Sequence, residues 1–327
     1  MGYKEILRSQ LVRNHIATRR HWWSEYIYHF SHVTNIASIL NEGKIKSRAE
    51  IMRKLPIGYN DNASSEVIDG TSFDVHEYVR FYFRPLTPTQ YRNEGVKSNF
   101  EVDQFNAHCP VPVFLLFDTD ILEDERTMFS YESLASRHHV ERYNNIYDFI
   151  RAPFRDIYHT GPISREDNSS IIKKRRHAEV LIKDSYDLSL LRLIICRTEA
   201  EQETLFNLID ENAKRLYRDK IVLLKNDYCR DMFYYDKLMI NKVTKIDDQI
   251  IIYFNKCDTL LRNISIKWTN LQGIILTYWT SLDTNLSEFM QEGNKIVFNI
   301  PELSSETFFK LTVTIDENLV YQKDYYK

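Results

Sequence analysis

The chain has 327 residues, of which 43% are hydrophobic and 27% are charged, and its formal net charge is −3. These values are typical of a globular protein with two domains or one large domain, and the small net charge neither requires nor excludes a nucleic-acid partner. The cysteines are widely separated without a CxxC pair, which predicts reduced thiols, and no apolar run approaches the ~20 residues that span a bilayer. We therefore expect a soluble cytoplasmic protein that has no membrane partner.

The first part of the chain alternates between helical and strand patterns. Amphipathic spacing predicts one helix or a pair of short helices at 3–24 and helices at 34–43 and 199–218. Runs of aromatic and branched residues predict strands at 26–30, 75–83, 111–117, 178–182, 190–196 and 221–224. Thr34 is the expected N-cap of the second helix, and Gly43 is its expected C′ residue. This mixture of elements predicts an α+β fold.

After about residue 238 the pattern changes to short alternating strands. The strand-like segments are 249–255, 263–268, 273–279, 295–300, 307–315 and 319–325, with turn signals between them. Short strands at this density, without a helical pattern, predict a C-terminal antiparallel β-sandwich. We expect two domains, an α+β domain at 1–237 whose N-terminal extension 1–24 is helical, and a small all-β domain at 238–327.

The first motif with chemical potential is Tyr28-His29-Phe30-Ser31-His32, at the end of a predicted strand. Its simplest interpretation is an edge strand with exposed histidines. A metal site is disfavoured because this three-residue spacing crosses from strand to helix, and no cysteine or third histidine lies nearby. We therefore predict no metal.

The second motif is the aromatic strand that follows His76. Alternation along a strand points Arg80 and Tyr82 to one face and Phe81 and Phe83 to the other. A core strand whose aromatic residues only pack is the structural interpretation, but arginines inside such a strand are unusual for a purely structural core.

The third motif joins the basic run 173–177 to Glu179, which opens the predicted strand 178–182. A carboxylate at the mouth of a strand, directly behind cationic residues, suits chemistry on an anionic substrate. A solvated basic helix end that leads into a strand would give the same pattern.

Together the three motifs resemble those of the DarT ADP-ribosyltransferases. The sequence Tyr28-His29-Phe30-Ser31-His32-Val33-Thr34-Asn35-Ile36 resembles the family's opening motif YHxTHxxNL. Val75 to Phe83 is similar to its strand hDYVPFYF, and Arg176 to Leu181 is similar to its catalytic strand RQAEFLV. The resemblance covers about residues 25–235 and leaves 238–327 outside it. It implies an ADP-ribosyltransferase-like split β-sheet core with flanking helices, and NAD as co-substrate.

The resemblance also implies roles for single residues in binding and cleaving NAD. Glu179 would hold the 2′-hydroxyl of the ribose next to nicotinamide, offset the positive charge of the transition state and accept the proton of the incoming base. His29 and Ser31 would hold the adenine-side ribose and the nicotinamide amide, Tyr82 would flank the nicotinamide ring, and His76 is a weaker candidate nearby.

An arginine between the first two motifs would grip the pyrophosphate and assist catalysis, since its fork matches phosphate oxygens. We expect this second catalytic residue to be Arg53, with Arg48 as the alternative. The loop at about 157–170 and the basic run after it occupy the place where the family binds its target. Phosphate contacts are expected from Lys173, Lys174, Arg175 and Arg176, and base stacking from Tyr158.

The function implied is an NAD-dependent mono-ADP-ribosyltransferase toxin that modifies a base of single-stranded DNA and releases nicotinamide, in a toxin–antitoxin or phage-defence system. The family's PRSPMLY is replaced here by 85–91 and its FTDxxA by 117–122, so an RNA target in a toxin–antitoxin–chaperone system is the alternative. A protein-modifying transferase, a non-catalytic nucleic-acid-binding module and a pure interaction protein are further alternatives. The expected protein partner is an antitoxin, either a macrodomain hydrolase or one assisted by a chaperone.

Overall fold

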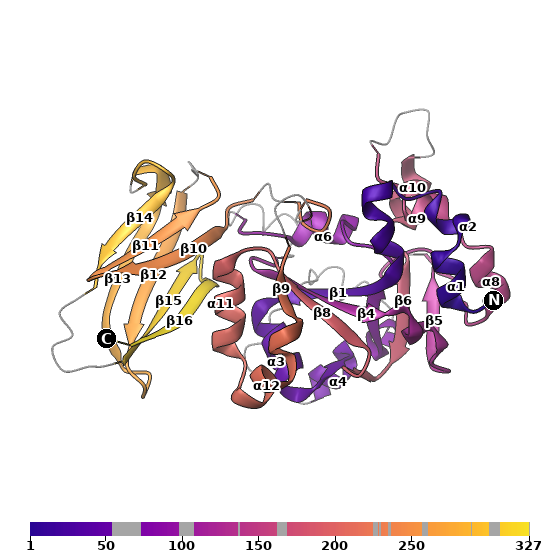
Figure 1. The fold of residues 1–327 in the computed structure, drawn as a ribbon, viewed down its shortest axis with the longest axis horizontal. Helices are drawn as coiled ribbons and strands as arrows, with labels where there is room; N and C mark the ends of the chain where they lie inside the picture. The colour runs from indigo at the N-terminus through magenta and orange to yellow at the C-terminus, as the bar shows by residue number, and fades with distance from the viewer. Residues whose placement is uncertain are drawn as a thin grey trace.

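The computed structural model describes residues 1–53, 73–97, 108–136, 138–161, 169–224, 228, 230–234, 237–256, 261–288, 290–300 and 308–326. Helices and one large mixed sheet form one part of the molecule, and mainly antiparallel strands form the other, as Figure 1 shows. The confirmed fold class is α+β. Among the described residues, no helix is both long and apolar enough to cross a membrane.

The N-terminal extension is helical and divided into short helices, which is closer to the second of the two predicted arrangements. It consists of α1 (Tyr3–Arg8), α2 (Gln10–Arg13) and the 3-10 helix η1 (Thr18–Glu25). Ser9 separates the first two because its backbone is extended and its hydroxyl donates to the carbonyl of Ile6, a local bond that competes with the helix. The predicted amphipathic face remains, since Ile6, Leu7 and Val12 are buried.

The central sheet has seven strands in the order β5-β6-β3-β1-β4-β8-β9, and only β8 and β9 run parallel. The strands are β1 (Tyr26–His32), β3 (Tyr78–Tyr82), β4 (Pro112–Asp118), β5 (Thr127–Ser130), β6 (Glu179–Lys183), β8 (Leu191–Cys196) and β9 (Ile221–Leu223). β1 pairs with β4 along its whole length, but its ladder with β3 has a single aligned pair, Tyr28 with Tyr82. The sheet is therefore close to splitting between β1 and β3, in agreement with the predicted split-sheet core.

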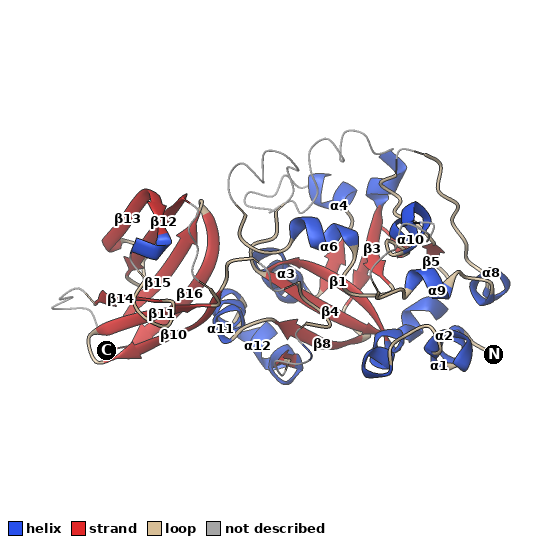
Figure 2. Ribbon diagram, turned by 90° about the horizontal axis from the view of Figure 1, so that it is seen from above, coloured by secondary structure: helices blue, strands red, loops and turns tan. Residues whose placement is uncertain are grey.

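Short helices surround this sheet, and a small second sheet pairs β2 (Lys44–Lys46) with β7 (Ser185–Asp187). The surrounding helices are α3 (Val33–Glu42), α4 (Arg48–Arg53), η2 (Phe73–Glu77), α6 (Pro88–Asn93), η3 (Thr119–Glu123), α8 (Ile146–Ile150), α9 (Phe154–Ile157), α10 (Ser169–Arg175), α11 (Glu199–Leu208), α12 (Glu211–Tyr217) and η4 (Arg218–Lys220). Figure 2 shows them around the strands in a second view.

Two helix boundaries differ from the prediction. The N-cap of α3 is His32 rather than Thr34, because its ring nitrogen accepts from the backbone N–H of Thr34. The predicted helix 199–218 is divided after Leu208, because the Asp210 side chain accepts from the N–H of Ala213 and begins a new helix. Gly43 has the left-handed conformation expected after α3, with φ of 72°.

The C-terminal strands form two antiparallel sheets, as predicted. One sheet contains β10 (Ile240–Ile246), β11 (Gln249–Phe254) and β14 (Lys295–Asn299), and the other contains β12 (Leu261–Thr269), β13 (Ile275–Asn285), β15 (Phe308–Ile315) and β16 (Asn318–Tyr326), with η5 (Leu286–Glu288) after β13. Both sheets contribute to one buried core, for example through Ile252 and Val313. β10 is an additional strand that precedes the predicted ones.

The two parts are joined through α11 and β16, which lie side by side in Figure 1. The Tyr321 hydroxyl donates to Glu203 at 2.8 Å, and the N–H of Gln322 donates to the Thr204 hydroxyl at 3.1 Å. The Thr198 hydroxyl donates to the carbonyl of Ile240 at 2.8 Å. We propose that the domain boundary lies at residue 237, between β9 and β10, and that the β-domain packs on the larger domain rather than hanging from it.

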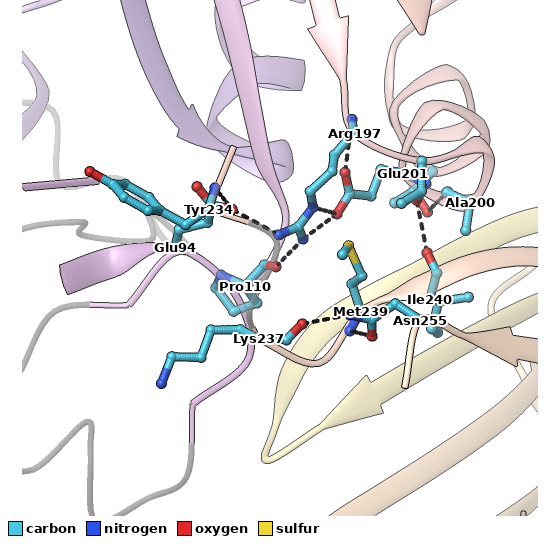
Figure 3. A network of polar contacts seen from close by, with 12 residues as sticks. Glu94, Pro110, Arg197, Ala200, Glu201, Tyr234, Lys237, Met239, Ile240 and Asn255 are labelled. Carbon is cyan, nitrogen blue, oxygen red and sulfur yellow. Dashed lines mark hydrogen bonds and ion pairs between the residues drawn. The ribbon is translucent and has the colours of Figure 1, made fainter. Parts of the chain in front are cut away.

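A buried charge network lies beside this junction. Arg197 donates to Glu94 at 3.2 Å, to Glu201 at 3.0 Å and to the carbonyl of Pro110 at 3.2 Å, and Glu94 also accepts from the N–H of Tyr234 at 3.0 Å (Figure 3). The side chains of Arg197, Glu94 and Glu201 are almost completely buried. One arginine therefore binds two carboxylates and, through Glu94, fixes the segment that leads to β10.

Replacing Arg197 with alanine is expected to lower the free energy of unfolding by about 3–5 kcal/mol, because two buried carboxylates lose their shared cation. Urea unfolding measures the change. The control is Arg215→Ala, at an exposed arginine bonded to Asn212, with an expected change within about 0.5 kcal/mol. Similar losses in both variants would show that the network contributes little.

Stability should also fall below neutral pH, partly through His108. Its buried Nε2 accepts from the N–H of Lys97 at 3.1 Å, so the ring is neutral, and burial, followed by the charge of Lys97, lowers the pKa of His108 to about 4. The pKa is about 6.5 in the unfolded chain. The stability that neutral His108 contributes to the fold is therefore complete above pH ~6.5 and is lost as the pH falls toward 4.

His108→Gln should remove this share of the pH dependence, about 2 kcal/mol between neutral pH and pH ~5. Urea unfolding of both proteins across this range measures it. If the free energy of unfolding changes with pH equally in the wild type and in His108→Gln, His108 is not the source of this pH dependence.

Candidate active site

Glu179 is the first residue of β6, and it lies between two neighbouring strands. It aligns with Tyr82 of β3 and with Ser130 of β5. Its side chain is completely buried, although it carries a carboxylate. Alternation places Arg80, Tyr82 and Glu179 on one face of the sheet, whereas Phe81 and Val180 point into the main apolar core.

Arg80 is the partner of this carboxylate. Its Nη2 donates to Oε1 of Glu179, and its Nε donates to Oε2 at 3.1 Å, so the guanidinium binds both oxygens. The backbone N–H of Leu134 also donates to Oε2, at 3.1 Å, and Nη2 of Arg80 donates to the Ser133 hydroxyl at 2.9 Å. Burial alone would lower the pKa of Arg80, but the Glu179 carboxylate outweighs burial and raises it.

Tyr82 lies on the same face, as the sequence predicted. Its ring is 6.0 Å from that of Phe30, and burial raises the pKa of its hydroxyl, which is hydrogen-bonded to Thr89. The Thr89 hydroxyl is in turn 3.1 Å from Nδ1 of His177, two residues before Glu179. Burial, with the positive charges of Arg80 and Arg92, lowers the pKa of His177 to about 4, so this ring is neutral at physiological pH.

His29 contacts the backbone of β3 from the face opposite to Arg80, Tyr82 and Glu179. Its Nδ1 lies 3.1 Å from the carbonyl oxygen of Arg80, beside the point where the β1–β3 ladder ends. A carbonyl only accepts, so Nδ1 carries the hydrogen and Nε2 of the neutral ring is an acceptor. Burial lowers the pKa of His29 to about 4. Its ring packs edge-on against Phe81, at 5.8 Å, and therefore contacts the core face of β3.

Ser31 follows on the same strand and is buried. Its hydroxyl accepts from the Asn35 amide at 2.9 Å, which links the end of β1 to α3. The opening motif is thus held by the strand and by the helix that it precedes.

Two predicted site residues lie elsewhere. His76 is in η2, at the other end of β3 from the Tyr82–Glu179 pair, and β3 rises roughly 13 Å between Tyr78 and Tyr82. Arg53 is the last residue of α4, which packs beside η2 and β3, and its side chain is exposed. The structure therefore groups Arg53 with His76 rather than with Glu179.

The basic run divides into exposed and bonded residues. Lys173 and Lys174 are exposed in the last turn of α10. Arg175 pairs with Glu132 at 3.1 Å, and Arg176 bonds to Nδ1 of His159 and the carbonyl of Gly161. The exposed lysines are the part of the run available to phosphates. Residues 162–168 of the predicted target-binding loop lie outside the described residues.

Tyr158 does not lie where base stacking requires it. It follows α9, its side chain is fully buried, and its ring is stacked on Phe154. The predicted contact of this ring with an unpaired base is not available in this conformation, because neighbouring core residues already cover both the ring and its edge.

Three groups at the site escaped the sequence prediction: Arg80, the Ser133 hydroxyl and the Leu134 N–H. For Arg80 a signal existed, since alternation placed it on the face of Tyr82. For the other two no signal existed, because a backbone N–H is present at almost every residue and only the path of the 131–136 loop brings this one to Glu179.

Comparison with known proteins agrees with these motifs. The family described as "ssDNA thymidine ADP-ribosyltransferase, DarT" matches residues 28–234, more than half of the chain. Among solved structures, DarT of Thermus sp. 2.9 in complex with ADP-ribosylated ssDNA is 14% identical, with a TM-score of 0.47, over 62% of this chain and 95% of that one. The same protein with NAD+ is 15% identical, with a TM-score of 0.45, over 62% and 96%.

A third structure is DarTG of Thermosipho africanus in complex with ADP-ribose, which is 19% identical, with a TM-score of 0.44, over 68% of this chain and 53% of that one. Among curated protein sequences nothing matches.

Proposed function

The chain belongs to the DarT family of single-stranded-DNA thymidine ADP-ribosyltransferases, and from this premise we propose that Glu179 is its catalytic carboxylate. The family match confirms the predicted enzyme class, an NAD-dependent ADP-ribosyltransferase that modifies single-stranded DNA. The observation that carries the assignment of Glu179 is its state in the fold: a fully buried carboxylate, held by an arginine fork, in the strand that bears the family motif.

The chemistry follows from this state. The bond between ribose C1′ and the nicotinamide nitrogen breaks, nicotinamide leaves, and positive charge develops on the ribose before a base nitrogen of the DNA attacks C1′. A fixed carboxylate beside that ribose stabilises the charge more strongly in a buried site than in water. The proton released by the attacking base passes to the same carboxylate.

The NAD contacts follow from the opening motif and the aromatic strand. His29 offers a neutral Nε2 as an acceptor for a ribose hydroxyl, Ser31 offers its hydroxyl, and Tyr82 flanks the nicotinamide ring beside Glu179. Arg53, with Arg48 second, is the proposed pyrophosphate ligand, since an exposed guanidinium at the end of α4 is free to meet phosphate oxygens. His76 is the weakest member of this set.

The target is proposed to approach over α10. Lys173 and Lys174 are exposed in the last turn of α10, six and five residues before Glu179, so they are placed to neutralise phosphates of a strand whose base enters the site. RNA is the second candidate, because segments 85–91 and 117–122 depart from the family motifs. An antitoxin is the proposed partner, and the cytoplasm is the proposed compartment.

Glu179→Gln is expected to lower transfer of ADP-ribose from labelled NAD to single-stranded DNA by at least ~100-fold, because the amide can neither offset the charge nor accept the proton. The matched control is Glu203→Gln on α11, where the side chain contacts β16 instead. Parallel reactions with RNA and with lysate protein identify the polymer that is labelled. Equal labelling by Glu179→Gln and the wild type would show that Glu179 is not the catalytic carboxylate.

Replacing Lys173 and Lys174 together with glutamine should weaken binding of single-stranded DNA and reduce the slope of log K against log salt by about 1.4, which is ~0.7 for each lost phosphate contact. Fluorescence anisotropy at several salt concentrations measures the slope. The control replaces two exposed lysines of the β-domain, Lys245 and Lys267. An unchanged slope would place the DNA on another surface.

A further inference from the structure

We propose that Arg80 is the positioning residue of the catalytic carboxylate, holding Glu179 in one orientation and as an anion until it accepts the proton of the base. The proposal rests on the proposed function of Glu179. It adds a residue that the opening, strand and catalytic motifs do not assign: in the family's strand hDYVPFYF, the position of Arg80 is occupied by proline.

The register of β3 and β6 places the Arg80 side chain within reach of Glu179. Tyr82 is the direct cross-strand neighbour of Glu179, and Arg80 precedes Tyr82 by two residues on the same face, so Arg80 and Glu179 are diagonal neighbours. At this separation the long arginine side chain reaches the carboxylate with its fork, and both oxygens accept from it. The rigid β3–β6 ladder keeps the two Cβ atoms in this relation.

Burial explains why the carboxylate needs this partner. Glu179 is removed from water, and the donors that replace its hydration are two nitrogens of Arg80 and the N–H of Leu134. Without Arg80 a single backbone donor remains among these, and a buried carboxyl with so little compensation takes up a proton at neutral pH. A protonated carboxyl can neither offset positive charge nor accept the proton of the base.

Arg80 also joins the two sides of the narrow β1–β3 junction. Its side chain binds Glu179 of β6 and the Ser133 hydroxyl, and its backbone carbonyl accepts from His29 of β1. One residue therefore fixes the relation between the proposed catalytic carboxylate and a proposed NAD ligand.

The same contact could instead block the carboxylate until Arg80 moves away. The number of acceptor positions favours the positioning role. A carboxylate has about four lone-pair positions, and the described donors occupy all but roughly one of them. One position is left for a ribose hydroxyl while Arg80 stays bound, so the arginine does not need to leave.

The test is the pH dependence of kcat/KM for transfer from NAD to single-stranded DNA in Arg80→Met and Arg80→Lys. In Arg80→Met the acid limb should move to about pH 8, so that activity is reduced roughly tenfold at pH 7 and recovered in alkali. Arg80→Lys keeps a charge without the fork and should lie between Arg80→Met and the wild type. The matched control is Arg142→Met, at a partly buried arginine that pairs with Asp74 near the other end of β3.

Each other outcome decides against the proposal. A loss that is equal at every pH in both variants would make Arg80 a structural residue, and higher activity of Arg80→Met at neutral pH would make it a block. If Arg80→Met does not fold, a profile of Arg80→Lys that overlays the wild type overturns the proposal by itself. Glu179→Gln, measured alongside, distinguishes failure of this proposal from failure of the proposed function. Wild-type activity in that variant would contradict the catalytic role of Glu179, whatever the Arg80 variants show.

Discussion

The structure depends on how weakly β1 is joined to β3. β1 is fully paired with β4 on one side, but on the other side its ladder with β3 is reduced to the Tyr28–Tyr82 pair. Backbone groups left over at such a junction need other partners. The Arg80 carbonyl finds one in the His29 ring, so a side chain continues the contact where the backbone ladder ends. The two halves of the sheet can then diverge without losing their connection.

Buried charge is handled in the same way at distant places in the molecule. Glu179 is bound by Arg80, the Glu94–Glu201 pair is bound by Arg197, and Asp316 in the β-domain is bound by Arg262 at 3.1 Å. In each case the cation is an arginine, whose planar fork satisfies a carboxylate with several directed bonds and is more weakly hydrated than an ammonium. The difference lies in the surroundings. Arg197 and Arg262 are almost wholly buried, whereas Arg80 retains partial exposure on the face of the sheet that bears Tyr82.

The sequence predicted the strands and the motifs well, because alternation and apolar runs report burial directly. It predicted less about interruptions within helices. Ser9 and Asp210 stop helices whose apolar spacing continues across them, and a cap is recognised only when its side chain is seen to bond. The face of Arg80 could be inferred, but its partner lies 99 residues away, and local pattern carries no information about that pairing. Tyr158 shows the converse limit, since its polar sequence context gave no sign that tertiary packing would cover it.

The short connection between α10 and β6 has a consequence for the length of nucleic acid that the proposed binding mode needs. Only residues 176–178 separate the end of the helix from Glu179. A fully extended chain would therefore place the Cα atoms of Lys174 and Glu179 at most ~18 Å apart. In the proposed binding mode, a phosphate held at the helix end therefore lies within a few nucleotides of the base at the carboxylate. The minimum footprint of the target is set by the covalent spacing of the protein, without any contact to bases further along.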